Sequence, residues 1–158
     1  MEVHVSEQIR IDAPIETVWS FIEDPQKELE WRGSAITELE QLDDGPIEPG
    51  TRYRGASKVG PGSAKPYVNE VSAVQPPAFI SWRDAEGEDA VGGGGSYRLE
   101  RDGEGTVMHI DLTYEALSLT GFLMLAAIKV MGPRTVRQFL ETLKSVAERD
   151  AARERVAP

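Results

Sequence analysis

Aromatic side chains that carry a hydroxyl or an indole N–H are the residues of this sequence best suited to bind and orient a small molecule. Tyr53, Trp82 and Tyr97 lie in segments that alternate between apolar and polar residues, and the alternation assigns all three to one face of a sheet. Such a face combines apolar area with hydrogen-bond donors, which is the mixture found in small-molecule pockets. The pattern therefore predicts a ligand site, with plain core packing as the alternative for any one of these side chains.

The same alternation divides the rest of the sheet into an inner and an outer face. The inner, concave face is predicted to carry Tyr53, Val71, Ile80, Trp82, Tyr97, Leu99, Ile110, Leu112 and Tyr114. The outer face is predicted to carry Arg52, Arg54, Arg98, His109 and Asp111. The parity of Tyr67 and Glu70 stays open, because a bulge next to Pro66 would reverse it. Glu70 is the first acid to consider for chemistry if the register is reversed.

A helical segment near the C-terminus supplies further candidates. Arg134 lies in the first turn of the last predicted helix, where it could reach the mouth of the site and pair with a ligand carboxylate or phosphate. Lys129 could act in the same way, and for both the alternative is an exposed cation that pairs with an acid. Residues 122–131 carry flexible Leu and Met side chains and are predicted to form a lid that moves at Gly132-Pro133.

These considerations give one set of predicted ligand-binding residues. They are Trp19, Trp31, Tyr53, Tyr67, Val71, Trp82, Tyr97, Leu99, Ile110, Leu123, Ala127, Met131 and Arg134. No catalytic residue is assigned. No cofactor and no metal are predicted, because the chain has no cysteine and its histidines, His4 and His109, are expected to point away from the site.

Composition limits the possible partners. The formal net charge of -10 disfavours nucleic acid and stable adsorption to an anionic membrane. The longest apolar run, Gly121–Val130, is interrupted by Lys129 and is shorter than a membrane-spanning helix requires. The N-terminal residues lack the apolar stretch of a secretory signal, so the expected location is the cytoplasm.

Turn signals divide the chain into the elements that would position these side chains. A strand is predicted over Val3–Ile11, followed by helices over Pro14–Glu23 and Gln26–Trp31. Further strands are predicted over Ala35–Leu42, Thr51–Lys58, Tyr67–Val74, Phe79–Asp84, Val91–Arg101 and Thr106–Glu115. Helical periodicity covers Ser118–Arg149, divided in two at Gly132-Pro133. Residues 1–150 are predicted to form a single domain and residues 151–158 a frayed tail.

Several short stretches resemble, in the same order, the motifs of one superfamily. They are Ile11–Trp19, Asp24-Pro25 with Trp31, Gly50–Tyr53, Val71–Trp82 with Pro76-Pro77, and Tyr97–Glu100 before Gly105-Thr106. Over nearly its whole length the chain is similar to the START-like, helix-grip (SRPBCC) superfamily, which includes Bet v 1 and the polyketide cyclase/dehydrase-like proteins. The resemblance implies an α+β fold with a curved, seven-stranded antiparallel sheet wrapped around a long C-terminal helix, and with two short helices between its first two strands.

The resemblance also implies a cavity between sheet and helix for a hydrophobic ligand. The first hypothesis is a noncatalytic protein that binds or transports a lipid or a polyketide-like molecule. The second is a metal-free polyketide cyclase or dehydratase in which tyrosine hydroxyls and Arg134 orient substrate carbonyls. The third is a module that binds a protein partner. Fold alone does not choose between them, and ligand identity and oligomeric state stay open.

Overall fold

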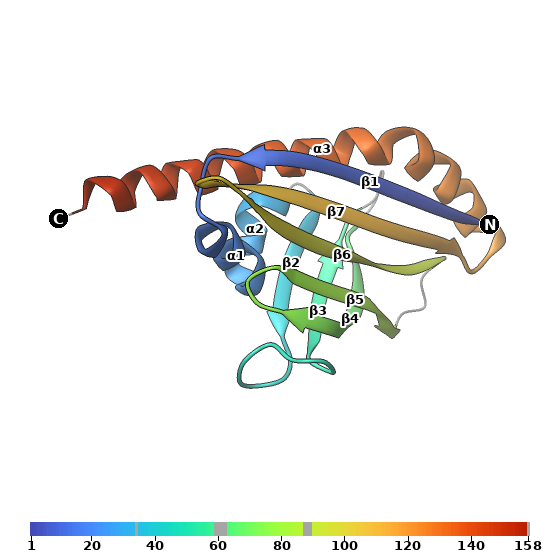
Figure 1. The fold of residues 1–158 in the computed structure, drawn as a ribbon. Coiled ribbons are helices and arrows are strands. Elements are labelled where there is room, and N and C mark those ends of the chain that lie inside the picture. The colour runs from blue at the N-terminus through green and yellow to red at the C-terminus, as the bar shows by residue number, and fades with distance from the viewer. Residues whose placement is uncertain (34, 59–62, 87–89, 158) are drawn as a thin grey trace.

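A curved antiparallel sheet with a long helix beside it forms the framework of the molecule (Figure 1). The computed structural model describes residues 1–33, 35–58, 63–86 and 90–157. The strands are β1 (Glu2–Ile11), β2 (Ile36–Gln41), β3 (Arg52–Ser57), β4 (Lys65–Gln75), β5 (Phe79–Glu86), β6 (Val91–Asp102) and β7 (Gly105–Ala116). The helices are α1 (Ile15–Glu23), α2 (Pro25–Arg32) and α3 (Leu119–Val156). In these described ranges the sheet has seven strands in the order β1-β7-β6-β5-β4-β3-β2, which confirms the predicted helix-grip fold.

The two faces of the sheet follow from its antiparallel register. Val5 of β1 pairs with Leu112 of β7, and Ile110 of β7 pairs with Tyr97 of β6. All four side chains are buried on the inner face, while Arg98 and the other outward neighbours are exposed or half-buried. A face that alternates in this way must be covered by a helix over at least part of its area.

Two short helices close one end of the inner face. α2 begins at Pro25, and the Asp24 side chain accepts a hydrogen bond from the Gln26 N–H (2.9 Å), so proline and cap together fix the start of the helix. α2 ends at Arg32, one residue beyond the predicted Trp31. This residue belongs to the candidate site described below.

α3 is continuous, so the predicted division at Gly132-Pro133 is wrong. Proline removes one backbone donor from the helix, but the helix is held against the sheet at this point. A Cβ placed on Gly132 would lie 3.1 Å from Val5 Cγ2, so the helix backbone packs closely on β1 at this point. Packing on β1 therefore maintains the helix across the proline.

The last turns of α3 also differ from expectation. The frayed tail predicted over 151–158 is helical as far as Val156, because Ala151 is buried and the Thr17 hydroxyl of α1 donates to Glu154 Oε2 (3.3 Å). The predicted stripe of Val136, Leu140, Leu143 and Ala147 is buried as expected.

α3 covers only part of the inner face. Within the described residues its main contacts with the sheet are with β1 and β7, with a few to β6, and Figure 1 shows it running along the β1 edge. Its C-terminal half also contacts α1 and α2. The inner faces of β3, β4 and β5 are therefore left without cover from α3, and this region holds the candidate site.

Candidate ligand-binding site

The inner face of the sheet carries the aromatic side chains as predicted. Tyr97 is buried at its centre, and Trp82 and Tyr53 are half-buried and pack against the core. Val71, Ile80, Leu99, Ile110 and Leu112 are buried around them, and Tyr114 is half-buried. The outward positions of Arg52, Arg54, Arg98, His109 and Asp111 are consistent with the register. The division of the sheet into two faces is thus confirmed.

The register also settles the parity of Tyr67. Tyr67 pairs with Gly55 in the β3–β4 ladder, and a Cβ added to Gly55 would collide with the Tyr67 ring, so the ring lies over the glycine on the inner face. Glu70 takes the outer face, where it accepts a hydrogen bond from Arg83 Nη2 (2.9 Å). Glu70 is therefore part of a surface ion pair and not of the site.

A charged cluster lies at the closed end of this face, formed by α2 and β6. Arg32 Nη1 donates to Glu28 Oε1 (2.9 Å) and to the Tyr97 hydroxyl (2.5 Å), and that hydroxyl donates to Glu28 Oε1 (2.8 Å). The Arg32 and Glu28 side chains are 19% and 13% exposed. We call Glu28, Arg32 and Tyr97 the polar triad. Such hydrogen-bonded charge pairs fix the positions of their members more strictly than exposed ion pairs do.

The electrostatics keep every phenol of the site protonated at neutral pH. Burial raises the pKa of Tyr97 well above its usual value and raises the pKa of Tyr67 to about 12. Burial likewise raises the pKa of Tyr53. Burial disfavours the charged form of Arg32, but the interactions with Tyr97 and Glu28 outweigh it and raise the pKa of the guanidinium. The site thus offers neutral hydroxyls and a permanent cation, which are suited to holding oxygen atoms of a ligand.

Aromatic rings surround the Tyr97 ring. The Trp82 ring centroid lies 4.6 Å away in a tilted arrangement, and the Trp31 ring centroid lies 5.5 Å away in a T-shaped arrangement. The Trp31 indole N–H is already used, since it donates to the Phe21 carbonyl (3.0 Å). Trp82 is the ring of this group that remains partly exposed, so it provides flat apolar area next to the triad.

One buried polar atom on this face has no partner in the described part of the chain. Asn69 Oδ1, on β4, is inaccessible and accepts no hydrogen bond. Asn69 pairs with Tyr53 of β3 and with Asp84 of β5, and its side chain shares the inner face with Tyr67. Buried acceptors are normally satisfied, so Asn69 Oδ1 is an exception on this face.

The other predicted site residues are divided between the core and the surface. Trp19 is buried in α1, and its indole N–H donates to Glu23 Oε2 (2.9 Å), so it has no free polar group to offer a ligand. Leu123, Ala127 and Arg134 are exposed on the side of α3 opposite the buried Leu125, and Met131 is exposed as well. The structure does not bring these four together with the aromatic inner face. Lys129 is also exposed.

The two charged members of the triad are not among the site residues predicted from the sequence. Glu28 and Arg32 are four residues apart in α2, and this spacing places them on one side of a helix. The helix predicted from the sequence ends at Trp31 and does not include Arg32, so it does not contain this i,i+4 pair. Their closeness to Tyr97, more than sixty positions away in sequence, has no local signal.

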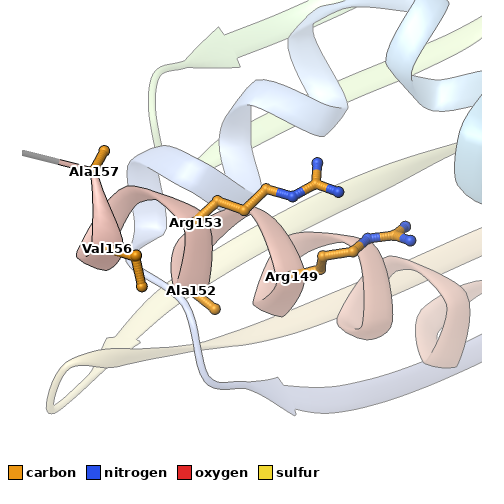
Figure 2. Close-up of a pocket in the computed structure, with 5 residues that line it drawn as sticks. All are labelled: Arg149, Ala152, Arg153, Val156 and Ala157. Atoms are coloured by element: carbon orange, nitrogen blue, oxygen red, sulfur yellow. The ribbon is translucent and has the colours of Figure 1, made fainter.

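Two further features of the structure lie outside this site. The described residues contain no group of three His, Cys, Asp or Glu side chains that could hold a metal ion. A shallow surface pocket near the end of α3 is lined by Arg149, Ala152, Arg153, Val156 and Ala157 (Figure 2). All five lie on or directly after one helix, so the pocket lacks the second element that would enclose a ligand.

Comparison with known families gives the context for this geometry. Residues 2–148 match the family described as polyketide cyclase / dehydrase and lipid transport. The chain belongs to this family. No curated protein matches the chain.

Solved structures share the fold of this polyketide cyclase/dehydrase family member at low sequence identity. It is similar to the Zhui aromatase/cyclase from Streptomyces sp. R1128, with a TM-score of 0.77, 20% identity, and 94% of this chain and 95% of the other covered. It is similar to a START superfamily protein from Mycobacterium smegmatis, with a TM-score of 0.74, 18% identity, and 92% and 97% covered. It is also similar to the protein TTHA0849 from Thermus thermophilus, with a TM-score of 0.73, 22% identity, and 92% and 97% covered. At these identities the comparisons establish the fold.

Proposed function

We propose that this family member binds a largely apolar small molecule that carries an oxygen-containing polar group. The observation that carries the proposal is the polar triad at the closed end of a half-exposed aromatic face. The apolar body would lie against Trp82, Tyr67 and Tyr53, and the polar group would reach Arg32. The family, which includes lipid-transport proteins and cyclases, supports hydrophobic ligands in general.

Arg32 is well suited to receive the polar group. Its hydrogen bonds within the described residues all come from Nη1, and a guanidinium has further N–H donors on Nε and Nη2. Those donors can bind a carbonyl, a phenolate or a carboxylate. Since Glu28 already balances the charge of Arg32, a neutral carbonyl or hydroxyl suits the triad better than a second anion.

Asn69 would give the ligand a second polar contact once the side chains that cover its Oδ1 move aside. Its unpartnered Oδ1 accepts a hydrogen bond, whereas the outer nitrogens of Arg32 donate. A ligand with both a hydroxyl and a carbonyl, such as a hydroxylated aromatic ketone, would satisfy both. The remaining predicted contacts, Val71, Leu99 and Ile110, are almost fully buried and would form the floor of the site.

A binding experiment tests this proposal. The purified protein is titrated with a fluorescent hydroxyflavone, a hydroxylated aromatic ketone, and binding is followed by quenching of tryptophan emission. Tyr97→Phe removes a triad hydroxyl, and loss of the orienting hydrogen bonds is expected to weaken binding by about tenfold. Glu70→Gln, on the outer face, is the matched control and should bind as the wild type does. Equal affinities of all three proteins would reject the triad as part of the site.

An enzymatic role is the second candidate, and the Glu28 carboxylate favours it. Glu28 Oε1 accepts hydrogen bonds from a neutral phenol and a guanidinium. A carboxylate so placed can remove a proton next to a ligand carbonyl while Arg32 stabilises the developing oxyanion, as an aldol-type cyclisation requires. Glu28→Gln should then abolish turnover of a poly-β-ketone substrate while binding of the hydroxyflavone is retained. Unchanged turnover would exclude Glu28 as the base.

A further inference from the structure

The first half of α3 exposes an apolar surface that no described part of the chain covers. Leu119, Leu123 and Val130 are 87%, 73% and 80% exposed, and Met131 is 64% exposed. Phe122 is about half exposed, and the small residues Ala126 and Ala127 lie between these side chains. We call these seven residues the α3 apolar face. Contiguous exposed surface of this kind marks an interaction site more often than isolated apolar residues do.

The α3 apolar face is large because the first half of α3 is apolar on its outer side as well as on the side toward the sheet. On the side toward the sheet, Gly121 lies against the Ala90 carbonyl, Gly132 lies against Val5, and Leu125 is fully buried. α3 contains a stretch of 18 residues that is apolar enough to enter a membrane, and only 17% of this stretch is buried. A helix that is hydrophobic all round is normally enclosed on every side. In this protein the side of α3 that faces away from the sheet is exposed to solvent.

The charge of this segment is opposite to that of the whole chain. Residues 116–140 contain none of the 27 acidic residues, whereas they contain Lys129, Arg134 and Arg137. Arg137 is paired with Glu7 (3.3 Å), while Lys129 and Arg134 are exposed next to the apolar face. The net charge of the chain is -10, so a segment that is both apolar and cationic is exceptional within it.

The positive charge of Lys129 and Arg134 indicates which kind of partner could cover the α3 apolar face. In a symmetric dimer through the α3 apolar face, Lys129 and Arg134 of both copies would approach one another, and the segment supplies no acid to compensate them. A negatively charged surface above a hydrocarbon layer complements both the positive charge and the apolar area of this face. An anionic lipid bilayer has this structure, and amphipathic helices with basic residues lie in its interface.

We propose that the α3 apolar face docks the protein reversibly on an anionic lipid bilayer, with the helix lying in the plane of the interface. The helix does not cross the bilayer in this arrangement, because its second half is part of the core through Val136, Leu140 and Leu143. Acids that lie farther than about 8 Å from the lipid headgroups are screened at physiological salt, so they oppose docking only weakly. Glu2 and Glu115, near the start of α3 in the fold, lie on the outer face of the sheet.

Vesicle co-sedimentation of the full chain tests the proposal. The probes are vesicles of phosphatidylcholine alone and of phosphatidylcholine with about 30 mol% phosphatidylglycerol. The wild type is expected to bind the anionic vesicles more tightly. Val130→Glu places a charge in the apolar face at an exposed position that can accept it without unfolding, and it should reduce binding by about tenfold or more. Lys129→Gln with Arg134→Gln should remove most of the preference for anionic vesicles.

Matched variants at the other end of the same helix serve as controls. Val156 is 83% exposed, so Val156→Glu makes the same chemical change away from the face, and Arg155→Gln removes a cation there. Both should bind vesicles as the wild type does. Hydroxyflavone binding by Val130→Glu should remain unchanged, which separates docking from ligand binding.

Several results would overturn bilayer docking. They are absence of wild-type binding to anionic vesicles, equal losses in Val130→Glu and Val156→Glu, and a concentration-dependent dimer that Val130→Glu dissociates while vesicles have no effect. A dimer of this kind would show that the α3 apolar face binds a second copy of the chain.

Discussion

Replacing Tyr97 by phenylalanine removes one oxygen from the centre of the polar triad. The hydroxyl donates to Glu28 (2.8 Å) and accepts from Arg32 (2.5 Å), and hydrogen bonds to charged groups contribute about 1.5–3 kcal/mol each. Glu28 and Arg32 keep their direct hydrogen bond of 2.9 Å, so we count one such contribution and not two. The free energy of unfolding should fall by about 1.5–3 kcal/mol, which lowers the Tm of a domain of this size by roughly 3–12 °C.

Urea unfolding followed by tryptophan fluorescence measures this loss, and the slope against urea should stay unchanged. Tyr114→Phe is the matched control, because Tyr114 is half-buried on the same face and its hydroxyl has no hydrogen bond in the described part of the chain. The control should change the free energy by less than about 0.5 kcal/mol. Equal losses in the two variants, or no loss in Tyr97→Phe, would refute the view that the triad is a formed and stabilising network.

Three further predictions follow from burial and backbone geometry. Burial raises the pKa of Tyr67 to about 12 and raises the pKa of Tyr97 well above its usual value, so the unfolded chain loses these protons first. Stability should therefore be complete below about pH 10 and fall above it by up to about 1.4 kcal/mol per pH unit and tyrosine; urea unfolding at about pH 8 and 11 checks this, and a flat profile would contradict it. Leu140→Ala should cost about 2–5 kcal/mol in urea unfolding, since Leu140 is fully buried, and a loss below about 1 kcal/mol would show that α3 is loosely packed. Gly93→Ala should prevent folding or lower the Tm sharply, because φ is +147° and the new Cβ would collide with the Thr113 carbonyl; a circular dichroism melt like that of the wild type would disprove this.

The sheet could be predicted because its information is local. Alternation along Thr106–Glu115 and Val91–Arg101 places Ile110, Tyr97 and Leu99 on one face whatever their partners are. The parity of Tyr67 could not be decided in this way, because it depends on how β4 pairs with Gly55 of β3. The parity of Tyr67 is set by the pairing between β3 and β4, which alternation within one strand does not reveal.

The predictions for the helices failed because long-range contacts, and not local sequence, decide these features. The rule that proline interrupts a helix is local, and at Pro133 it was overruled by the packing of Gly132 on Val5. Arg134 was expected at the mouth of the site, yet the side of α3 that meets the sheet is set by β1 and β7, and that side excludes Arg134. The triad was missed because it joins α2 to β6 across the fold.

A crystal structure of the protein with a bound hydroxyflavone would test the proposed ligand site most directly. We expect electron density for the aromatic ring system against Trp82 and Tyr67, with a ligand oxygen within hydrogen-bond distance of Arg32. The proposed site would be contradicted by an inner face closed by its own side chains, or by ligand density at the end of α3 (Figure 2) and none beside Tyr97.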